Sequence, residues 1–189
     1  MRICIAATPS VAIPTLEALL ASDHEIVSVI TRPEAPAGRG RGLKSSAVSD
    51  WASANGIKLH KPESIEEISL LVAASDLVIT IGFGVLLPET TLNIPKHGFI
   101  NLHFSLLPAW RGAAPVQRAI ENGDHELGIS VFSLDEGMDT GPIYRQSSFP
   151  RDPSMRSKEA LEFLGEQGVA LIAQTLDDIS HGVLPTKQS

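Results

Sequence analysis

Short apolar runs alternate with longer mixed segments in the first half of the chain. Runs with the length of a buried strand lie at residues 2–7, 25–31, 57–60 and 76–81. Segments compatible with helices lie between them, at residues 11–21, 47–55 and 65–73. Ser10 is the candidate N-cap of the first helix, and Pro14 is tolerated because it falls in the first turn. The repeated strand–helix–strand order predicts a parallel sheet with right-handed crossovers.

The second half of the chain has a different pattern, with two alternating runs next to each other. Its expected elements are a strand at 98–103, a helix at 113–121, strands at 127–134 and 142–149, and a final helix at 157–179. The last two strands are expected to pair antiparallel, and Gly165 and Gly168 weaken the final helix. The whole pattern predicts an α/β fold, with a Rossmann-like, doubly wound, mostly parallel sheet and an antiparallel C-terminal strand pair.

Polar side chains interrupt the apolar strand at 98–103. Asn101 and His103 are two residues apart, so on a strand they share one face. A glycine-flanked turn at 135–141 adds carboxylates, among them Asp139. An amide, an imidazole and a carboxylate can stabilise an oxyanion and move a proton, so these residues form the candidate active site. The ordinary readings are a hydrogen-bonded core histidine and a turn aspartate.

Composition and charge narrow the functional classes. The chain has 189 residues, 43% of them hydrophobic and 20% charged, which is ordinary for a single globular domain. A net charge of −7 argues against bulk nucleic-acid binding through a basic surface, although it is compatible with a local basic patch. The single cysteine, Cys4, cannot form an internal disulfide. With no secretory signal and no apolar run of membrane-spanning length, the expected location is the cytoplasm.

Residues 32–46 form the candidate basic patch. This stretch is rich in proline and glycine, so it is expected to be a loop. It contains one acid, Glu34, and its cations are Arg32, Arg39, Arg41 and Lys44. A solvated surface loop is the ordinary reading. The alternative is a flexible basic loop that contacts phosphates and becomes ordered on binding.

A second candidate ligand segment follows the apolar strand at 76–81. Gly82 and Gly84 lie at its carboxyl end, where open α/β sheets bind ligands, and glycine lets a backbone approach a ligand closely. The same spacing also fits a turn that leads into a helix. A dinucleotide site is not expected, because the turn at 6–10 contains no glycine and therefore no G-x-G-x-x-G motif.

Other catalytic chemistries fit the sequence less well. The six histidines show no metal-binding spacing, so no metal site is expected. Ser105, His103 and Asp139 are the residue types of a serine hydrolase, but the G-x-S-x-G elbow is absent. Cys4 lies in the middle of a strand and is expected to be buried, which argues against a cysteine nucleophile.

Several motifs in sequence order carry a resemblance to a known family. They are Asn101-Leu102-His103, Ser105-Leu106-Leu107-Pro108, Arg111-Gly112-Ala113-Ala114-Pro115 and Asp135-Glu136-Gly137-Met138-Asp139-Thr140-Gly141. From Arg2 to about Gly182, the chain resembles the folate-dependent formyltransferases. The loop Thr31–Lys44 is similar to that of the branch that acts on initiator methionyl-tRNA. The resemblance implies a catalytic domain over 1–182, a linker that begins at 183–189, and a C-terminal β-barrel domain that is expected to be absent here.

The resemblance also implies a reaction. The formyl group of 10-formyltetrahydrofolate is transferred to the amino group of initiator methionyl-tRNA, which supports translation initiation, and no metal takes part. Glycinamide ribonucleotide and an amino sugar are the alternative acceptors. A folate-binding module without turnover is the alternative to an enzyme. Asn101, His103 and Asp139 match the catalytic positions of the family one by one.

The resemblance assigns binding roles to two further sets of residues. The folate-binding set is Gly84, Val85, Leu86, Leu87, Ser105, Leu106, Leu107, Pro108 and Asp135. The tRNA-binding set is Arg32, Arg39, Arg41, Lys44 and Arg111. In the first set, Leu86 and Leu87 supply apolar wall to the pterin pocket. In the second, Arg39 holds the position that probes the end of the acceptor stem.

Overall fold

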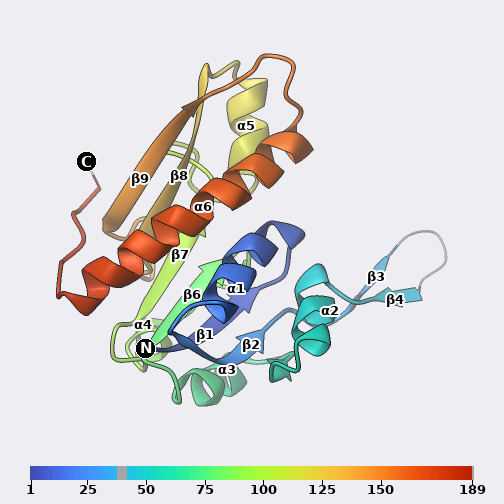
Figure 1. The fold of residues 1–189 in the computed structure, drawn as a ribbon, viewed down its shortest axis with the longest axis vertical. Coiled ribbons are helices and arrows are strands. Elements are labelled where there is room, and N and C mark those ends of the chain that lie inside the picture. The colour runs from blue at the N-terminus through green and yellow to red at the C-terminus, as the bar shows by residue number, and fades with distance from the viewer. Residues whose placement is uncertain (38–41, 189) are drawn as a thin grey trace. The chain divides into compact units, whose positions relative to one another are not determined.

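The computed structural model describes residues 1–37 and 42–188 of the chain, without the side chains at 35–37 and 42–44. The chain divides into two compact units, Met1–Gly98 and Phe99–Ser189. Each unit has its own strands and helices, which Figure 1 shows coloured along the chain.

Parallel strands form the sheet of the first unit. They are β1 (Arg2–Ala7), β2 (Glu25–Ile30), β5 (Leu59–His60) and β6 (Leu77–Ile81). Their spatial order is β5-β2-β1-β6, and each neighbouring pair is parallel. All five residues of β6 are buried, which explains why four of them are apolar and the strand does not alternate. The predicted parallel arrangement is confirmed.

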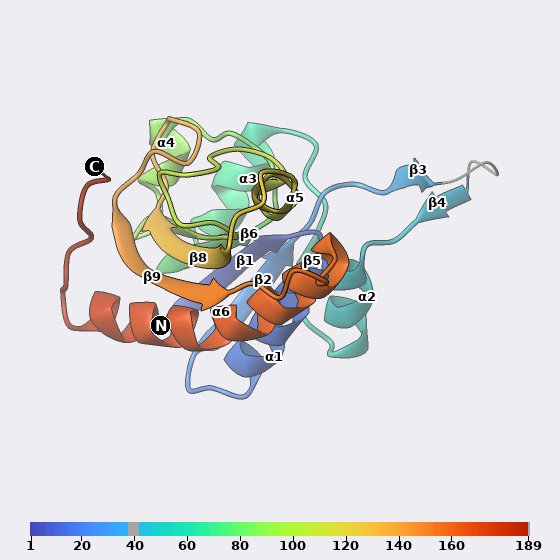
Figure 2. The same ribbon diagram turned by 90° about the horizontal axis from the view of Figure 1, so that it is seen from above.

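Helices connect these parallel strands. They are α1 (Ile13–Leu20), preceded by the 3-10 turn η1 (Ser10–Ala12), α2 (Ala47–Ala54) and α3 (Ile65–Val72), and a short helix, α4 (Glu89–Leu92), follows β6. Figure 2 shows α1 and α3 on opposite faces of the sheet. Ser46 and Ser64 cap α2 and α3 by accepting a hydrogen bond from a backbone N–H. The expectation that Ser10 caps the first helix is wrong, because a 3-10 turn leads into α1 instead.

The stretch expected to be a loop contains a short antiparallel hairpin. Its strands are β3 (Ala35–Ala37) and β4 (Gly42–Lys44). The expectation of a loop over 32–46 is corrected to this extent. Proline and glycine argued against strands, but a two-stranded ribbon has only edge strands, which tolerate proline. Two of the candidate cations, Arg39 and Arg41, lie outside the described residues.

Antiparallel strands form the sheet of the second unit. They are β7 (Phe99–His103), β8 (Glu126–Ser133) and β9 (Ile143–Pro150), in the order β7-β8-β9. The predicted antiparallel pair is β8 and β9, and β7 extends it because β8 also runs antiparallel to β7. Two helices belong to this unit, α5 (Pro115–Glu121) and α6 (Ser157–Ser180). Helix α6 contacts both β8 and β9 (Figure 1).

The long helix α6 packs on β7 at a glycine. A Cβ atom on Gly168 would lie 2.5 Å from Cδ2 of Leu102, which is buried, so a larger residue would collide with it. Gly165 and Gly168 were expected to weaken this helix. It is one uninterrupted helix of 24 residues, in which Gly168 allows close packing. Arg145 of β9 joins the other end of α6 by a bidentate ion pair with Asp178, at 2.5 and 2.8 Å.

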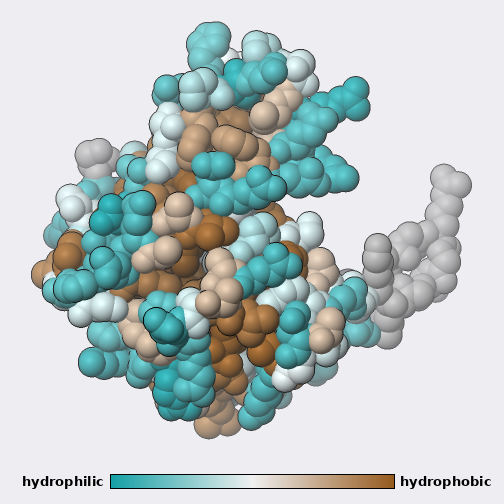
Figure 3. Space-filling view, viewed as in Figure 1, coloured by the Kyte–Doolittle hydropathy of each residue, from teal (hydrophilic) through white to brown (hydrophobic). Residues whose placement is uncertain are grey.

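Hydrophilic side chains cover much of the face shown in Figure 3, with hydrophobic side chains between them. Leu70, Leu86 and Leu184 are large apolar residues that are strongly exposed. No helix in the described part of the chain is both long and apolar enough to cross a membrane.

Candidate active site

The two polar residues of β7 lie on one face of the sheet. In the pairing of β7 with β8, Asn101 lies opposite Phe132 and His103 lies opposite Ser130. Phe132 packs edge-on against the His103 imidazole, with ring centroids 6.4 Å apart, so these two side chains occupy the same face. Directly opposed residues also share a face, which places Asn101 there as well. His103 is buried, and Asn101 is half-buried.

Each ring nitrogen of His103 faces an oxygen atom. Nε2 lies 3.0 Å from the backbone oxygen of Trp110, and because a carbonyl can only accept, Nε2 carries the proton of this hydrogen bond. Nδ1 lies 3.6 Å from Oδ2 of Asp139, which is longer than a hydrogen bond but within ion-pair distance when the ring is protonated. The structure therefore brings His103 and Asp139 together in the second unit.

A backbone donor fixes the carboxylate of Asp139. The N–H of Gly112 donates to Oδ2 at 2.7 Å, and this is the same oxygen that faces His103. The backbone of Asp139 has a φ of 56°. This left-handed conformation costs a non-glycine residue about 1–2 kcal/mol. Such strain persists where neighbours hold the backbone in place, and it is concentrated at functional sites.

The loop that contains Trp110 carries the other partner of His103. Trp110 also has a left-handed φ, of 57°, and its indole Nε1 donates to Oδ2 of Asp124 at 2.8 Å. Within the loop, the hydroxyl of Ser105 donates to the backbone oxygen of Ala109 at 2.6 Å. These bonds hold the carbonyl of Trp110 toward the imidazole.

Two residues that sequence reasoning missed support the same loop. Ser130 is fully buried on β8, and its hydroxyl donates to the backbone oxygen of Ser105 at 2.6 Å and accepts from the N–H of Leu107 at 3.1 Å. Gln146 of β9 donates from Nε2 to the backbone oxygen of Leu107 and to Ser130 Oγ, both at 2.9 Å. The sequence signal that could have identified Ser130 was a serine at an inward-facing position of an alternating apolar run.

The remaining candidate residues of this unit build the loops around His103. Oδ1 of Asp135 accepts from the N–H of Gly137 at 3.1 Å and from the hydroxyl of Thr140 at 2.7 Å, so Asp135 stabilises its own turn. Leu106 packs on Gly128, where a Cβ atom would lie 2.3 Å from Leu106 Cγ. Folate binding stays a prediction for Ser105, Leu106, Leu107, Pro108 and Asp135.

The glycine segment that follows β6 belongs to the first unit. Gly82 and Gly84 have φ values of 57° and 70°, in the left-handed region that favours glycine. Leu86 is 61% exposed, so its apolar side chain is available to a ligand, whereas Leu87 is 7% exposed and packs in the core. The folate-binding role of Gly84–Leu87 stays a prediction.

The candidate tRNA-binding cations that the structure describes occupy different places. Arg32 lies beside the glycine segment, with Nη1 3.9 Å from the position of a Cβ atom on Gly84. Arg111 is exposed in the second unit and donates to Oε1 of Gln188 from Nε at 3.1 Å and from Nη2 at 2.6 Å. Lys44 ends β4. Their contact with tRNA stays a prediction.

The alternative nucleophiles are buried or engaged. Burial raises the pKa of the Cys4 thiol to about 11, and a hydrogen bond from Ser28 offsets this only in part, so the thiolate is rare at neutral pH. The hydroxyl of Ser105 donates to a backbone oxygen and not to His103. Within the described ranges, no group of three or more His, Cys, Asp or Glu side chains is placed to hold a metal ion.

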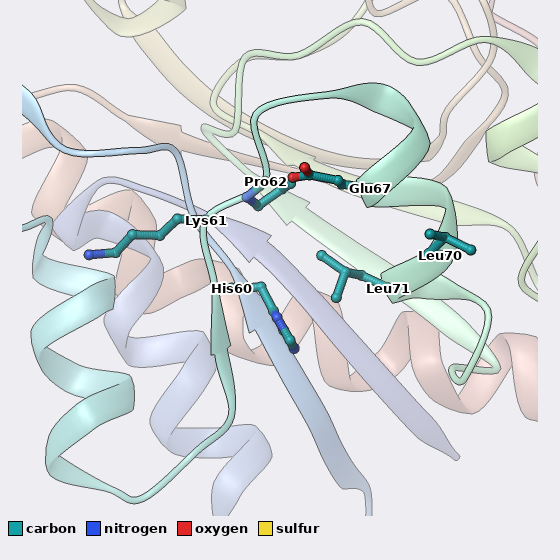
Figure 4. A pocket seen from close by; sticks show the side chains of 6 residues that line it. All are labelled: His60, Lys61, Pro62, Glu67, Leu70 and Leu71. Atoms are coloured by element: carbon teal, nitrogen blue, oxygen red, sulfur yellow. The ribbon is translucent and has the colours of Figure 1, made fainter.

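An open pocket of about 360 Å³ lies in the first unit, at the end of β5. Its lining residues are His60, Lys61, Pro62, Glu67, Leu70 and Leu71 (Figure 4). Nζ of Lys61 forms an ion pair with Glu34 at 2.6 Å, and burial, followed by the charge of Lys58, lowers the pKa of His60. None of the residues assigned to catalysis, folate or tRNA lines this pocket, so it gives no support to the predicted site.

Solved structures share the fold of the chain. Phosphoribosylglycinamide formyltransferase from Bacillus halodurans superposes with a TM-score of 0.78 at 23% identity, over 95% of each chain. The N-formyltransferase from Helicobacter canadensis, solved in complex with folinic acid and dTDP-3-aminofucose, superposes with a TM-score of 0.77 at 22% identity, over 100% of this chain and 68% of that one. The predicted fold class is therefore confirmed.

Sequence comparison extends the likeness from fold to family. The methionyl-tRNA formyltransferase of Salinispora tropica is 48% identical over 188 residues, an alignment that covers 96% of this chain and 60% of that protein. The chain thus spans about 60% of the length of this curated relative. A family model described as "Formyl transferase" matches residues 1–175. Because this match takes in nearly all of the chain, including the face that holds Asn101, His103 and Asp139, the chain belongs to the formyl transferase family.

Proposed function

We propose that this chain carries the active site of an enzyme that transfers the formyl group of 10-formyltetrahydrofolate to the amino group of initiator methionyl-tRNA, in support of translation initiation. One observation carries the proposal: 48% identity, over 96% of the chain, to a relative named methionyl-tRNA formyltransferase. The approach of Asp139 to His103 within 3.6 Å, on the face of β7 that also holds Asn101, supports it.

The residues of β7 supply the charge stabilisation that acyl transfer requires. The amine attacks the formyl carbon, and negative charge develops on the formyl oxygen. Asn101 donates a side-chain N–H to this oxygen, and His103 donates its Nε2–H, which exchanges the carbonyl of Trp110 for the formyl oxygen when substrate binds. One such donor contributes about 3–4 kcal/mol to the stability of the transition state. The shared face of Asn101 and His103 fits two donors that serve a single atom.

Asp139 orients the imidazole and balances its charge. When the ring of His103 is protonated, the carboxylate at 3.6 Å pairs with the positive charge, and the N–H of Gly112 keeps Oδ2 in position. The attacking amine must also lose a proton. The pair of His103 and Asp139, together with water, provides the groups that accept and relay it.

The folate donor is proposed to contact Gly84–Leu87, Ser105–Pro108 and Asp135. Leu86 offers an exposed apolar side chain for a flat ring, and Gly84 presents backbone without a Cβ atom. The N-formyltransferase from Helicobacter canadensis, which has the same fold, was solved in complex with folinic acid. When bound, the folate supplies the formyl group and leaves as tetrahydrofolate.

The tRNA is proposed to contact the basic side chains assigned by the family resemblance, which are Arg32, Arg39, Arg41, Lys44 and Arg111. We propose that residues 1–182 form the catalytic domain and that 183–189 begin a linker. With a net charge of −7 and only a few cations for phosphate contacts, the tRNA affinity of this chain alone is expected to be low at physiological salt.

A comparison of acceptors tests the proposal. Formyl transfer from 10-formyltetrahydrofolate is measured with methionyl-tRNA, glycinamide ribonucleotide and an amino sugar nucleotide. We expect turnover with methionyl-tRNA, at high tRNA concentration, and none with the other two acceptors. Turnover of glycinamide ribonucleotide or of the amino sugar alone would reassign the acceptor. If the chain binds folate but transfers the formyl group to none of the three acceptors, the result would favour a folate-binding module without catalytic activity.

A further inference from the structure

After α6, the chain returns to the sheet of the second unit. Gly182, with a φ of 72°, follows the helix, and Thr186 then forms a bridge with Ile143 at the start of β9, through backbone hydrogen bonds of 2.7 and 2.8 Å. The bridge brings Gln188, which is half-buried, to the turn that carries Asp139.

The side-chain amide of Gln188 donates hydrogen bonds to two backbone oxygens of this turn. Nε2 donates to the carbonyl of Asp139 at 2.9 Å and to the carbonyl of Gly141 at 2.8 Å. An amide NH2 group has two donors, so both are used. The two carbonyls lie on either side of Thr140, and the amide therefore spans the turn at the point where Asp139 adopts its left-handed backbone.

The oxygen of the same amide is held by Arg111. Its Nε and Nη2 donate to Oε1 of Gln188 at 3.1 and 2.6 Å. Arg111 precedes Gly112, whose N–H donates to the Asp139 carboxylate at 2.7 Å. Gln188 therefore ties together two loops: one contains Asp139, and the other contains the backbone donor that fixes the Asp139 side chain.

Such a tether matters because acyl transfer is sensitive to small displacements. A misplacement of about 1 Å at a reacting group can reduce the rate about 100-fold. A non-glycine residue with a positive φ relaxes when its surroundings stop holding it. Loss of the bonds to Gln188 would free the backbone of Asp139 and let Oδ2 move from its place 3.6 Å from His103.

We propose that Gln188 is a positioning residue for the formyl-transfer site, whose side-chain amide holds the Asp139 turn and the Arg111 loop so that the Asp139 carboxylate faces His103. The proposal rests on the proposed function of that site. It goes beyond the family assignment, because Gln188 lies outside residues 1–182 and outside every motif that carries the resemblance.

Steady-state kinetics test this role in Gln188→Ala and Gln188→Glu. The glutamate variant keeps an oxygen for Arg111 but replaces the two hydrogen bonds to the turn by repulsion between a carboxylate oxygen and two carbonyl oxygens. We expect kcat to fall about 10- to 100-fold in both variants, with KM for folate and for methionyl-tRNA within about twofold of the wild type. Lys187→Ala, at the exposed neighbour of Gln188, is the matched control and keeps the wild-type kcat.

A second measurement does not depend on turnover. The backbone amide resonance of Gly112 in a 15N-labelled chain reports its hydrogen bond to Asp139. In Gln188→Ala we expect this resonance to move toward its position in Asp139→Ala, and in Lys187→Ala to stay in place. If the wild-type chain shows no formyl transfer, the proposed function fails, and the Gly112 resonance still decides the positioning role.

Two results would overturn the proposal. One is a wild-type kcat in both Gln188 variants together with an unmoved Gly112 resonance. The other is an effect confined to KM for methionyl-tRNA, because it would show that Gln188 contacts the acceptor and does not position Asp139.

Discussion

At the scale of single residues, the site depends on two oxygen atoms placed around one imidazole. The carbonyl of Trp110 engages Nε2 of His103, and the carboxylate of Asp139 faces Nδ1. The turn at 135–141 offers several carboxylates. Asp135 accepts hydrogen bonds within its own turn, whereas Oδ2 of Asp139 faces Nδ1 of His103 at 3.6 Å. The chemical role of Asp139 thus follows from its position, since Asp135 has the same side chain.

Substitution of His103 or Asp139 should lower kcat by at least about 100-fold while the fold remains. We expect His103→Ala to lower kcat about 100- to 10,000-fold, because the oxyanion and the proton lose their donor and acceptor. Asp139→Asn keeps an oxygen for the N–H of Gly112 but removes the charge, and we expect at least about a 100-fold loss. Steady-state kinetics measure both effects, and circular dichroism checks the fold.

Ser148→Ala is the control for these two variants, because Ser148 is an exposed residue of β9. It should have wild-type kinetics. Normal turnover in Asp139→Ala would end the assignment of Asp139 to catalysis.

At the scale of elements, close backbone approaches decide which turns can form. The strands β8 and β9 are joined by the turn that contains Asp139, and the N–H of Ser133 donates to the carbonyl of Pro142 at 2.8 Å where the turn closes. Gly141 lies immediately before Pro142 at this point of closure. A Cβ atom there would be 1.8 Å from the backbone oxygen of Ser133. Glycine is therefore required at Gly141 for space.

Gly141→Ala should lower the free energy of unfolding by about 3 kcal/mol, at the upper end of the cost of overpacking, because its clash is with backbone and cannot be relieved by a rotamer change. Gly137→Ala is the matched control. Its Cβ atom would meet the side chain of Thr140, with Oγ1 at 2.0 Å, and this hydroxyl can rotate away at the cost of its hydrogen bond to Asp135. Urea denaturation compares the two, and an equal cost for both would contradict the backbone argument.

The ion pair that joins β9 to α6 predicts a pH dependence of stability. Hydrogen bonds from the Arg145 guanidinium hold the pKa of the Asp178 carboxyl below its usual value. A lowered folded-state pKa stabilises the protein above the unfolded-state pKa, and the contribution is lost as pH falls through the folded-state pKa. Asp178→Asn should thus be less stable than the wild type near pH 7, with a difference that shrinks below about pH 4.

Chemical denaturation at several pH values measures this effect of Asp178→Asn. Glu166→Gln, an exposed substitution on the same helix, is the control and should show no comparable change in the difference with pH. A difference between Asp178→Asn and the wild type that stays constant from pH 7 to below about pH 4 would contradict the ion-pair explanation.

At the scale of the whole molecule, one segment has a charge opposite in sign to the net charge of the chain. The chain has a net charge of −7, yet the stretch that contains the hairpin of β3 and β4 has a local excess of cations. An acidic molecule repels nucleic acid at long range, so a basic segment must supply any attraction. Salt dependence can therefore reveal which cations contact phosphate.

Arg39→Ala should weaken methionyl-tRNA binding and reduce the slope of log K against log salt by about one unit, because one phosphate contact is lost. Filter binding or fluorescence anisotropy at several salt concentrations measures both quantities. Lys158→Ala is the control, since it removes one exposed charge from the start of α6 and changes the net charge by the same amount. An equal effect of Lys158→Ala would show that only the net charge matters.

The pattern of apolar residues was sufficient to predict the strands that are buried in the sheet. The strand β1 was predicted with the bounds that the structure has, and β6 and β7 within one residue, because short, mostly apolar runs have few alternatives to a buried strand. The shared face of Asn101 and His103 followed from the two-residue period of a strand. The short hairpin of β3 and β4 was missed, because its sequence is rich in proline and glycine and shows no alternation of apolar and polar residues.

Contacts between residues that are distant in sequence became visible only in the folded chain. Nothing in the local pattern shows that Asp139 faces His103, that Ser130 and Gln146 support the loop before Trp110, or that Gln188 returns to the Asp139 turn. Their partners lie far away in sequence, and such pairs are set by strand register and chain return. Gly168 is a further example. In the sequence it indicated only a weak point of the helix, whereas in the structure it allows the helix to pack closely on Leu102 of β7.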